Sequence, residues 1–171
     1  HGDGYYAIVY EWDEDIYTTI LDRQGNFINR YTLTPGDDKA SYPDVAYDAN
    51  SGYFIVVWTY DRNGNGTQYD IRGLALSPVS GPLLPIVGVA ETSFDETSAS
   101  IACNHHDGNC LVAYKVIDAM NLGYIDGRLL SIDFDGIDIA SPAGFNISFL
   151  NDVYNPVVAW GQDQNTYLVA F

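Results

Sequence analysis

The sequence predicts a single all-β domain built from a repeated unit of short antiparallel strands. Three observations predict this fold class. Related segments recur along the chain, and short apolar runs alternate with turn residues such as Gly, Asn and Asp. Helical periodicity and helix caps are hard to find. The 171 residues suffice for one domain with a buried core, and we treat residues 1–171 as that domain.

The repeat is clearest in three segments that align without a gap, VAYDANSGYFIVVW (45–58), IACNHHDGNCLVAY (101–114) and VAWGQDQNTYLVAF (158–171). Ala46, Ala102 and Ala159 occupy the same place in them, and the first ten residues contain a partial copy, GDGYYAIVY. Each segment predicts one strand, a turn and a second strand. The second strand is continuously apolar, as expected for a strand that is covered on both faces.

A third strand follows in each of three units, with the sequences DIYTTIL (15–21), DIRGLAL (70–76) and YIDGRLL (124–130). A turn and a further extended segment come after it. Four short antiparallel strands per unit, covered on both faces, are typical of a β-propeller blade. We therefore expect a β-propeller or propeller segment of about three to three and a half four-stranded blades, with units near 1–40, 41–96, 97–153 and 154–171.

The pattern PDVAYD (43–48) followed by GYFIVVW (52–58) resembles the repeats of multi-bladed β-propellers in secreted prokaryotic surface proteins. The resemblance covers nearly the whole chain. It implies a propeller fold and an extracellular or cell-surface location. It says little about activity, because propellers host many functions.

The two ends of the chain carry incomplete units in this alignment. The first unit lacks its first strand, and the last lacks its third and fourth strands. The chain begins at His1, so we expect a mature processed form or a fragment. Open strands and apolar faces need a partner. We expect contacts at residues 4–10 and 156–171 to cross a chain or cleavage boundary, through self-association or the remainder of a longer propeller.

The charge of the chain limits its partners. Against 23 acidic residues there are seven Lys and Arg, for a net charge of −16. Phosphates would be repelled, which argues against nucleic acid and anionic membrane surfaces. No apolar run approaches the ~18 residues of a membrane span. Most of the acidic residues are Asp, which favours turns and oxygen-ligand sites.

The two cysteines, Cys103 and Cys110, lie in CNHHDGNC. They occupy the places of Tyr47 and Phe54 in the second unit, so the favoured prediction is a cross-strand disulfide that replaces an aromatic pair. A zinc site with His105 and His106 is the alternative, although the spacing matches no standard finger. A redox site is less favoured, because there is no C-x-x-C motif.

A candidate calcium loop follows the second strand of the second unit, with the sequence DRNGNGTQYD (61–70). Oxygen-bearing side chains at alternate positions, with Gly at a sharp turn, are typical of calcium loops. The expected ligands are Asp61, Asn63, Asn65, Thr67 and Asp70. The integrin-type pattern has its last Asp one place earlier, where this chain has Tyr69. A plain polar turn is the alternative.

Two sequons, at Asn65 and Asn146, permit N-glycosylation in a secreted protein. A glycan on Asn65 would compete with calcium in the same loop.

Another acidic cluster, Glu11, Asp13, Glu14 and Asp15, follows the second strand of the first unit. Propeller glycosidases use such acids, and a solvated acidic turn is the simpler interpretation. We therefore predict a non-catalytic extracellular module for binding or supramolecular assembly, with a carbohydrate or protein as candidate ligand. The alternative is a subunit or fragment of a larger propeller enzyme that acts on glycans.

Overall fold

The computed structural model describes residues 4–36, 39–133, 136–141, 144–148 and 153–171. These residues form strands and turns, with no helix among them. The all-β prediction is therefore confirmed. In the described residues, no helix is available that could cross a membrane.

The strands form four antiparallel sheets that follow one another along the chain. The first contains β1 (Tyr5–Trp12), β2 (Asp15–Asp22) and β3 (Phe27–Thr32). The second contains β4 (Lys39–Asp48), β5 (Tyr53–Asp61), β6 (Tyr69–Ser77) and β7 (Gly81–Ala90). The third contains β8 (Asp95–Cys103), β9 (Asn109–Ile117), β10 (Gly123–Asp133), β11 (Gly136–Ile139) and β12 (Phe145–Asn146). The fourth contains β13 (Val157–Gly161) and β14 (Thr166–Ala170).

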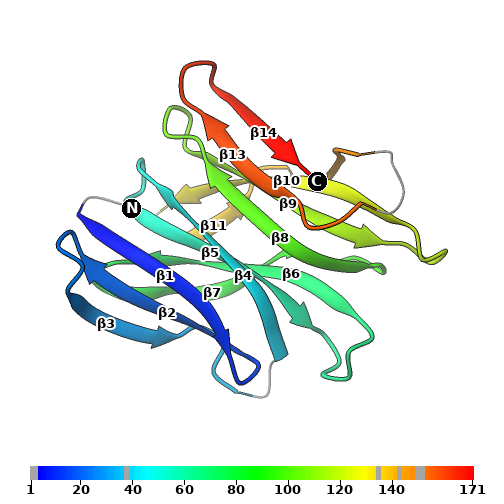
Figure 1. Cartoon of the computed structure of the whole chain (residues 1–171), viewed down its shortest axis with the longest axis horizontal. Helices are drawn as coiled ribbons and strands as arrows, with labels where there is room; N and C mark the ends of the chain where they lie inside the picture. Colours follow the sequence, from blue (N-terminus) through cyan, green and yellow to red (C-terminus); the bar gives the residue numbers. More distant parts are fainter. Residues whose placement is uncertain (1–3, 37–38, 134–135, 142–143, 149–152) are drawn as a thin grey trace.

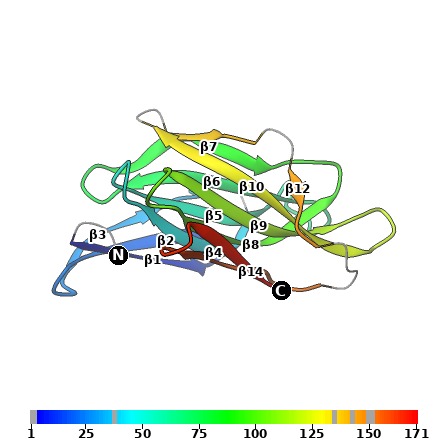
Figure 2. The ribbon, with the colours of Figure 1, turned by 90° about the horizontal axis from the view of Figure 1, so that it is seen from above.

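The sheets pack one on the next in chain order, with β1–β3 and β13–β14 at the two ends of the row (Figure 1). Seen from above, the second sheet runs from β4 at the lower edge to β7 at the upper edge (Figure 2). Consecutive sheets are also linked by polar contacts. The Asp44 carboxylate accepts hydrogen bonds from Ser100 Oγ and Ile101 N, both at 2.9 Å, and Ser100 Oγ accepts one from Val158 N at 3.1 Å. These bonds join β4, β8 and β13.

The core lies between the sheets, because the second strand of each inner unit is apolar on both sides. On β5, Val56 and Trp58 pack in a cluster with Ile16 and Ile20 of the first sheet. The intervening Val57 belongs to the cluster shared with the third sheet. Side chains alternate along a strand, so each inner sheet buries one face on its predecessor and the other on its successor. We call these the leading face and the trailing face.

The same division holds on β9. Its leading face, with Cys110, Val112 and Tyr114, packs toward the second sheet. Its trailing face, with Leu111 and Ala113, packs in a cluster with side chains of the fourth sheet. Equivalent positions of the sequence repeat therefore form equivalent contacts between consecutive sheets.

Candidate functional site

The predicted calcium loop connects β5 to β6 and begins at the buried Asp61. The Asp61 carboxylate accepts hydrogen bonds from Gly66 N at 2.6 Å and Asn63 N at 3.3 Å. Asn65 Oδ1 accepts bonds from the Thr67 amide at 3.2 Å and the Thr67 hydroxyl at 2.6 Å. Asp61 and Asn65 therefore act as internal acceptors that hold the loop in shape.

Asp70 does not join the other four predicted ligands. Residues Asp61 and Tyr69 are directly paired across β5 and β6, and so are Tyr60 and Asp70. Neighbouring pairs point to opposite faces of a sheet, so the Asp61 and Asp70 side chains point apart. The Asp70 carboxylate forms a bidentate ion pair with Arg62, whose Nη2 also donates to Thr92 O at 2.8 Å.

Arg62 is a structural partner that the sequence argument overlooked. It lies inside the candidate loop, and its hydrogen bond with Asp70 raises the pKa of its guanidinium. No group of three or more His, Cys, Asp and Glu side chains is arranged to hold a metal ion within the described part of the chain. Calcium binding by Asp61, Asn63, Asn65 and Thr67 stays a prediction.

The acidic cluster of the first unit lies beside this loop. A tight turn joins β1 to β2, with positive φ at Asp13 and Glu14. Glu11 and Glu14 line an open groove of about 350 Å³, together with Lys39, Asp61 and Tyr69. Lys39 Nζ lies 2.9 Å from Glu14 Oε1, and this contact raises the pKa of the lysine.

The four members of that acidic cluster have different hydrogen-bond partners. Asp15 accepts a hydrogen bond from Thr34 Oγ1 at 3.1 Å, and Glu11 accepts one from Tyr42 N at 3.3 Å. Asp13 does not line the groove. Asp15 is therefore bound to the segment after β3, Glu11 to β4 and Glu14 to Lys39. Asp13 lies in the exposed turn.

The disulfide prediction is confirmed. Cys103 and Cys110 form a disulfide and are directly paired residues of β8 and β9. Tyr47 and Phe54 are the equivalent pair in the second sheet, with ring centroids 5.2 Å apart. The zinc alternative is wrong, because the disulfide occupies both of the thiolates that a zinc site would need. A redox-active pair also exists as a disulfide, so the redox alternative stays a prediction.

The two histidines between the cysteines are exposed and contact Trp160 of the fourth sheet. The ring centroids of His105 and His106 lie 4.9 and 5.7 Å from that of Trp160. Their role in the structure is therefore packing against the neighbouring hairpin.

Both predicted glycosylation sites are exposed. Asn65 lies in the β5–β6 loop, and Asn146 lies on β12, where its Nδ2 donates to Asp126 Oδ1 at 3.2 Å. Glycosylation itself stays a prediction at both positions.

The leading face of the first sheet has no sheet before it in the described chain. It carries Tyr6, Ile8, Tyr10 and Trp12 along β1. Ile8 is 50% exposed, and Val56, which has the same place on the inner β5, is 0% exposed. Tyr17 of β2 extends this face, because its ring stacks on Tyr10 at a centroid distance of 5.8 Å.

The trailing face of the fourth sheet is the complementary case. It carries Val157, Ala159, Leu168 and Ala170, and all four residues are exposed. Leu168 is 69% exposed, whereas Leu111, at the same place on β9, is 4% exposed. Among the described residues, the first sheet therefore exposes its leading face and the fourth sheet exposes its trailing face.

Comparisons with family models, with curated proteins and with solved structures found no match for the chain.

Proposed function

We propose that this protein is a non-catalytic extracellular module that assembles by stacking sheets, as in a β-propeller. In this assembly, the leading face of one copy packs on the trailing face of the next. The observation that carries the proposal is the contrast between Ile8 and Val56, and between Leu168 and Leu111. The exposed residues have the same positions in the repeat as residues that are buried between the inner sheets.

The repeat favours a second copy as the partner. Each inner interface of the chain joins a trailing face to a leading face, and the ends offer one face of each type. Such a head-to-tail contact is heterologous, so it produces a ring if it closes and a filament if it does not. A leading face on a second leading face would repeat none of the interfaces inside the chain.

The strength of the contact follows from the side chains involved. Fully burying a large apolar side chain contributes about 1.5–3 kcal/mol. Each face offers a few such side chains, among them Ile8 and Trp12 on one and Val157 and Leu168 on the other. Association itself costs ~4–15 kcal/mol and offsets much of this gain, so we expect association to require high protein concentration.

The net charge of −16 opposes association of two copies. Salt screens this repulsion, because the Debye length falls from about 10 Å at 0.1 M to about 3 Å at 1 M ionic strength. Association should therefore become stronger as salt rises. An extracellular location agrees with the disulfide, because disulfides persist in oxidising compartments.

Sedimentation velocity over a range of protein concentrations tests the proposal. The wild-type chain should associate, and Ile8→Arg and Leu168→Glu should each sediment as a monomer. An equimolar mixture of the two variants should form a 1:1 dimer, because it restores one intact leading face and one intact trailing face. Val79→Arg is the matched control, since Val79 is 76% exposed in the turn between β6 and β7, and it should associate like wild type.

Three results would contradict this proposal. A wild-type chain that stays monomeric at high concentration and high salt would mean that another partner covers these faces. Association that survives Leu168→Glu would show that the contact joins two leading faces. Loss of association in Val79→Arg would show that the added charge alone causes the effect.

A further inference from the structure

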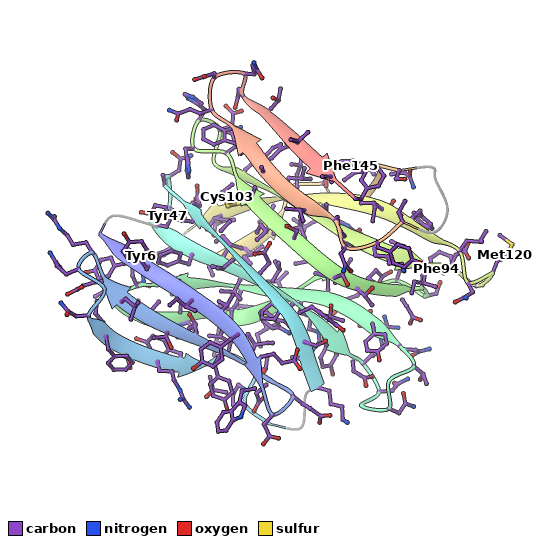
Figure 3. All side chains as sticks on the ribbon, viewed as in Figure 1. Tyr6, Tyr47, Phe94, Cys103, Met120 and Phe145 are labelled. Atoms are coloured by element: carbon purple, nitrogen blue, oxygen red, sulfur yellow. A yellow bond between two sulfur atoms is a disulfide. The ribbon has the colours of Figure 1, made fainter. Side chains whose placement is uncertain are left out.

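A separate pocket of about 160 Å³ lies at one end of the third sheet. Its wall combines two carboxyl groups, one guanidinium group and several aromatic rings, supplied by Phe94, Glu96, Tyr114, Tyr124, Asp126 and Arg128. These residues come from β8, β9, β10 and the connection before β8. Phe94 marks the pocket in Figure 3, at the end of the molecule opposite Tyr6, Tyr47 and Cys103.

Glu96 is the buried acid of the pocket. Its side chain is fully buried, and its carboxyl group accepts hydrogen bonds from Thr92 N at 3.3 Å and from the Thr92 hydroxyl. Burial raises the pKa of Glu96. Burial also raises the pKa of Asp126, against the opposing effect of the hydrogen bond from Asn146.

Tyr114 and Arg128 supply hydrogen-bond donors to the same pocket. The two side chains are hydrogen-bonded to each other, and burial raises the pKa of Tyr114 to about 12. The phenol therefore keeps its proton at any physiological pH. Gly144 lines the wall here, and a Cβ atom at this position would lie 3.1 Å from Tyr114 Oη. The close approach of this backbone narrows the pocket.

The mixture of groups selects a neutral ligand. Because Glu96 is buried and bound to Thr92, the charges that a ligand can reach are those of Asp126 and Arg128. An anion would meet Asp126 inside a protein of net charge −16, and a cation would meet Arg128. A polyhydroxylated ligand satisfies both kinds of group, because a hydroxyl both donates and accepts hydrogen bonds. Phe94 and Tyr124 offer apolar ring surface for the C–H faces of such a ligand.

We propose that this pocket binds one neutral sugar residue, with its hydroxyls at Asp126 and Arg128 and its apolar face on Phe94. The volume corresponds to about five water molecules at ~30 Å³ each, which admits a single ring and excludes a larger ligand from full burial. Glycan binding at this end of the third sheet is independent of assembly through the end sheets.

Saturation-transfer NMR with neutral methyl glycosides of glucose, galactose, mannose and N-acetylglucosamine tests this binding. The Ile8→Arg variant is the background, so that failure of binding and failure of assembly are distinguishable. At least one glycoside should show transfer, and methyl glucuronide should show none. Phe94→Ala should reduce the transfer at least ten-fold, because it removes the ring on which the apolar face of the sugar lies. The variant should keep its fold, since Phe94 is 37% exposed.

Phe145→Ala is the matched control, since Phe145 is 41% exposed on β12 and is not one of the residues lining the pocket. It should bind like the background protein. Absence of transfer from all four neutral glycosides overturns the proposal, as does equal transfer in Phe94→Ala. Preferred binding of methyl glucuronide overturns the neutral ligand class. Cleavage of the glycoside during the experiment would replace binding by catalysis and would also overturn it.

Discussion

The inner strand β5 and the end strand β1 have the same sequence pattern and different surroundings. On β5 both faces are covered, and on β1 only the trailing face is covered. Phe54 and Val56 are buried, whereas Tyr6 and Ile8, at the same places in the repeat, are exposed. An apolar strand pattern therefore produces a face that can pack against another sheet. Its side chains are buried only where a neighbouring sheet covers that face.

The largest expected effect comes from a charge on the leading face. Val56→Asp should lower the free energy of unfolding by more than about 3 kcal/mol, because it buries an unpaired carboxylate between two sheets. Ile8→Asp at the equivalent exposed place should change it by about 0.5 kcal/mol or less in the monomer. Urea denaturation at low protein concentration measures both. Equal losses in the two variants would refute the distinction between inner and end faces.

The second expected effect concerns the disulfide hairpin, which stands where the second sheet has an aromatic pair. Replacing Cys103 and Cys110 with Ala should cost about 2 kcal/mol, at the low end for disulfides, because the closed loop is short. Chemical denaturation under non-reducing conditions gives the difference. In the wild type, alkylation of either cysteine should need prior reduction. Rapid alkylation of the native protein would contradict the structure of this hairpin.

A smaller effect concerns the buried acid at the junction of the second and third sheets. The raised pKa of Glu96 means that the folded state favours the protonated acid. Stability from this group is therefore complete below the ordinary pKa of 4.5 and is lost as pH rises through the folded value. Glu96→Gln cannot ionise, so its melting temperature should gain on that of wild type between about pH 4 and pH 7. A constant difference across this range would show that ionisation of Glu96 costs nothing.

The smallest expected effect is that of calcium on the β5–β6 loop. Calcium should raise the melting temperature of the wild type by mass action, since only the folded loop presents its oxygen atoms together. Asn63→Ala should reduce the increment and leave the fold intact, because Asn63 is exposed. We use Asn63 because Asp61 also holds the loop in shape through Gly66 N. Identical melting curves with calcium and with chelator would leave the loop as a polar turn.

The sequence by itself determined the strands and the hairpin disulfide. Alternation of apolar runs and turn residues is a local property, so it predicts strands wherever it occurs. Cys103 and Cys110 align with Tyr47 and Phe54, which are a cross-strand pair, and a repeat transfers such a register from one unit to the next. The same alignment placed incomplete units at the two ends, where Ile8 and Leu168 are exposed.

Only the tertiary structure decided which polar side chains meet. Arg62 takes Asp70 away from the predicted calcium ligands, because β5 and β6 turn Asp61 and Asp70 to opposite faces. Glu96 and Asp126 line one pocket although thirty positions separate them in the chain. Their environment depends on how deeply neighbouring strands bury each group. Burial is a property of the packed sheets, so no local pattern in the sequence could have shown it.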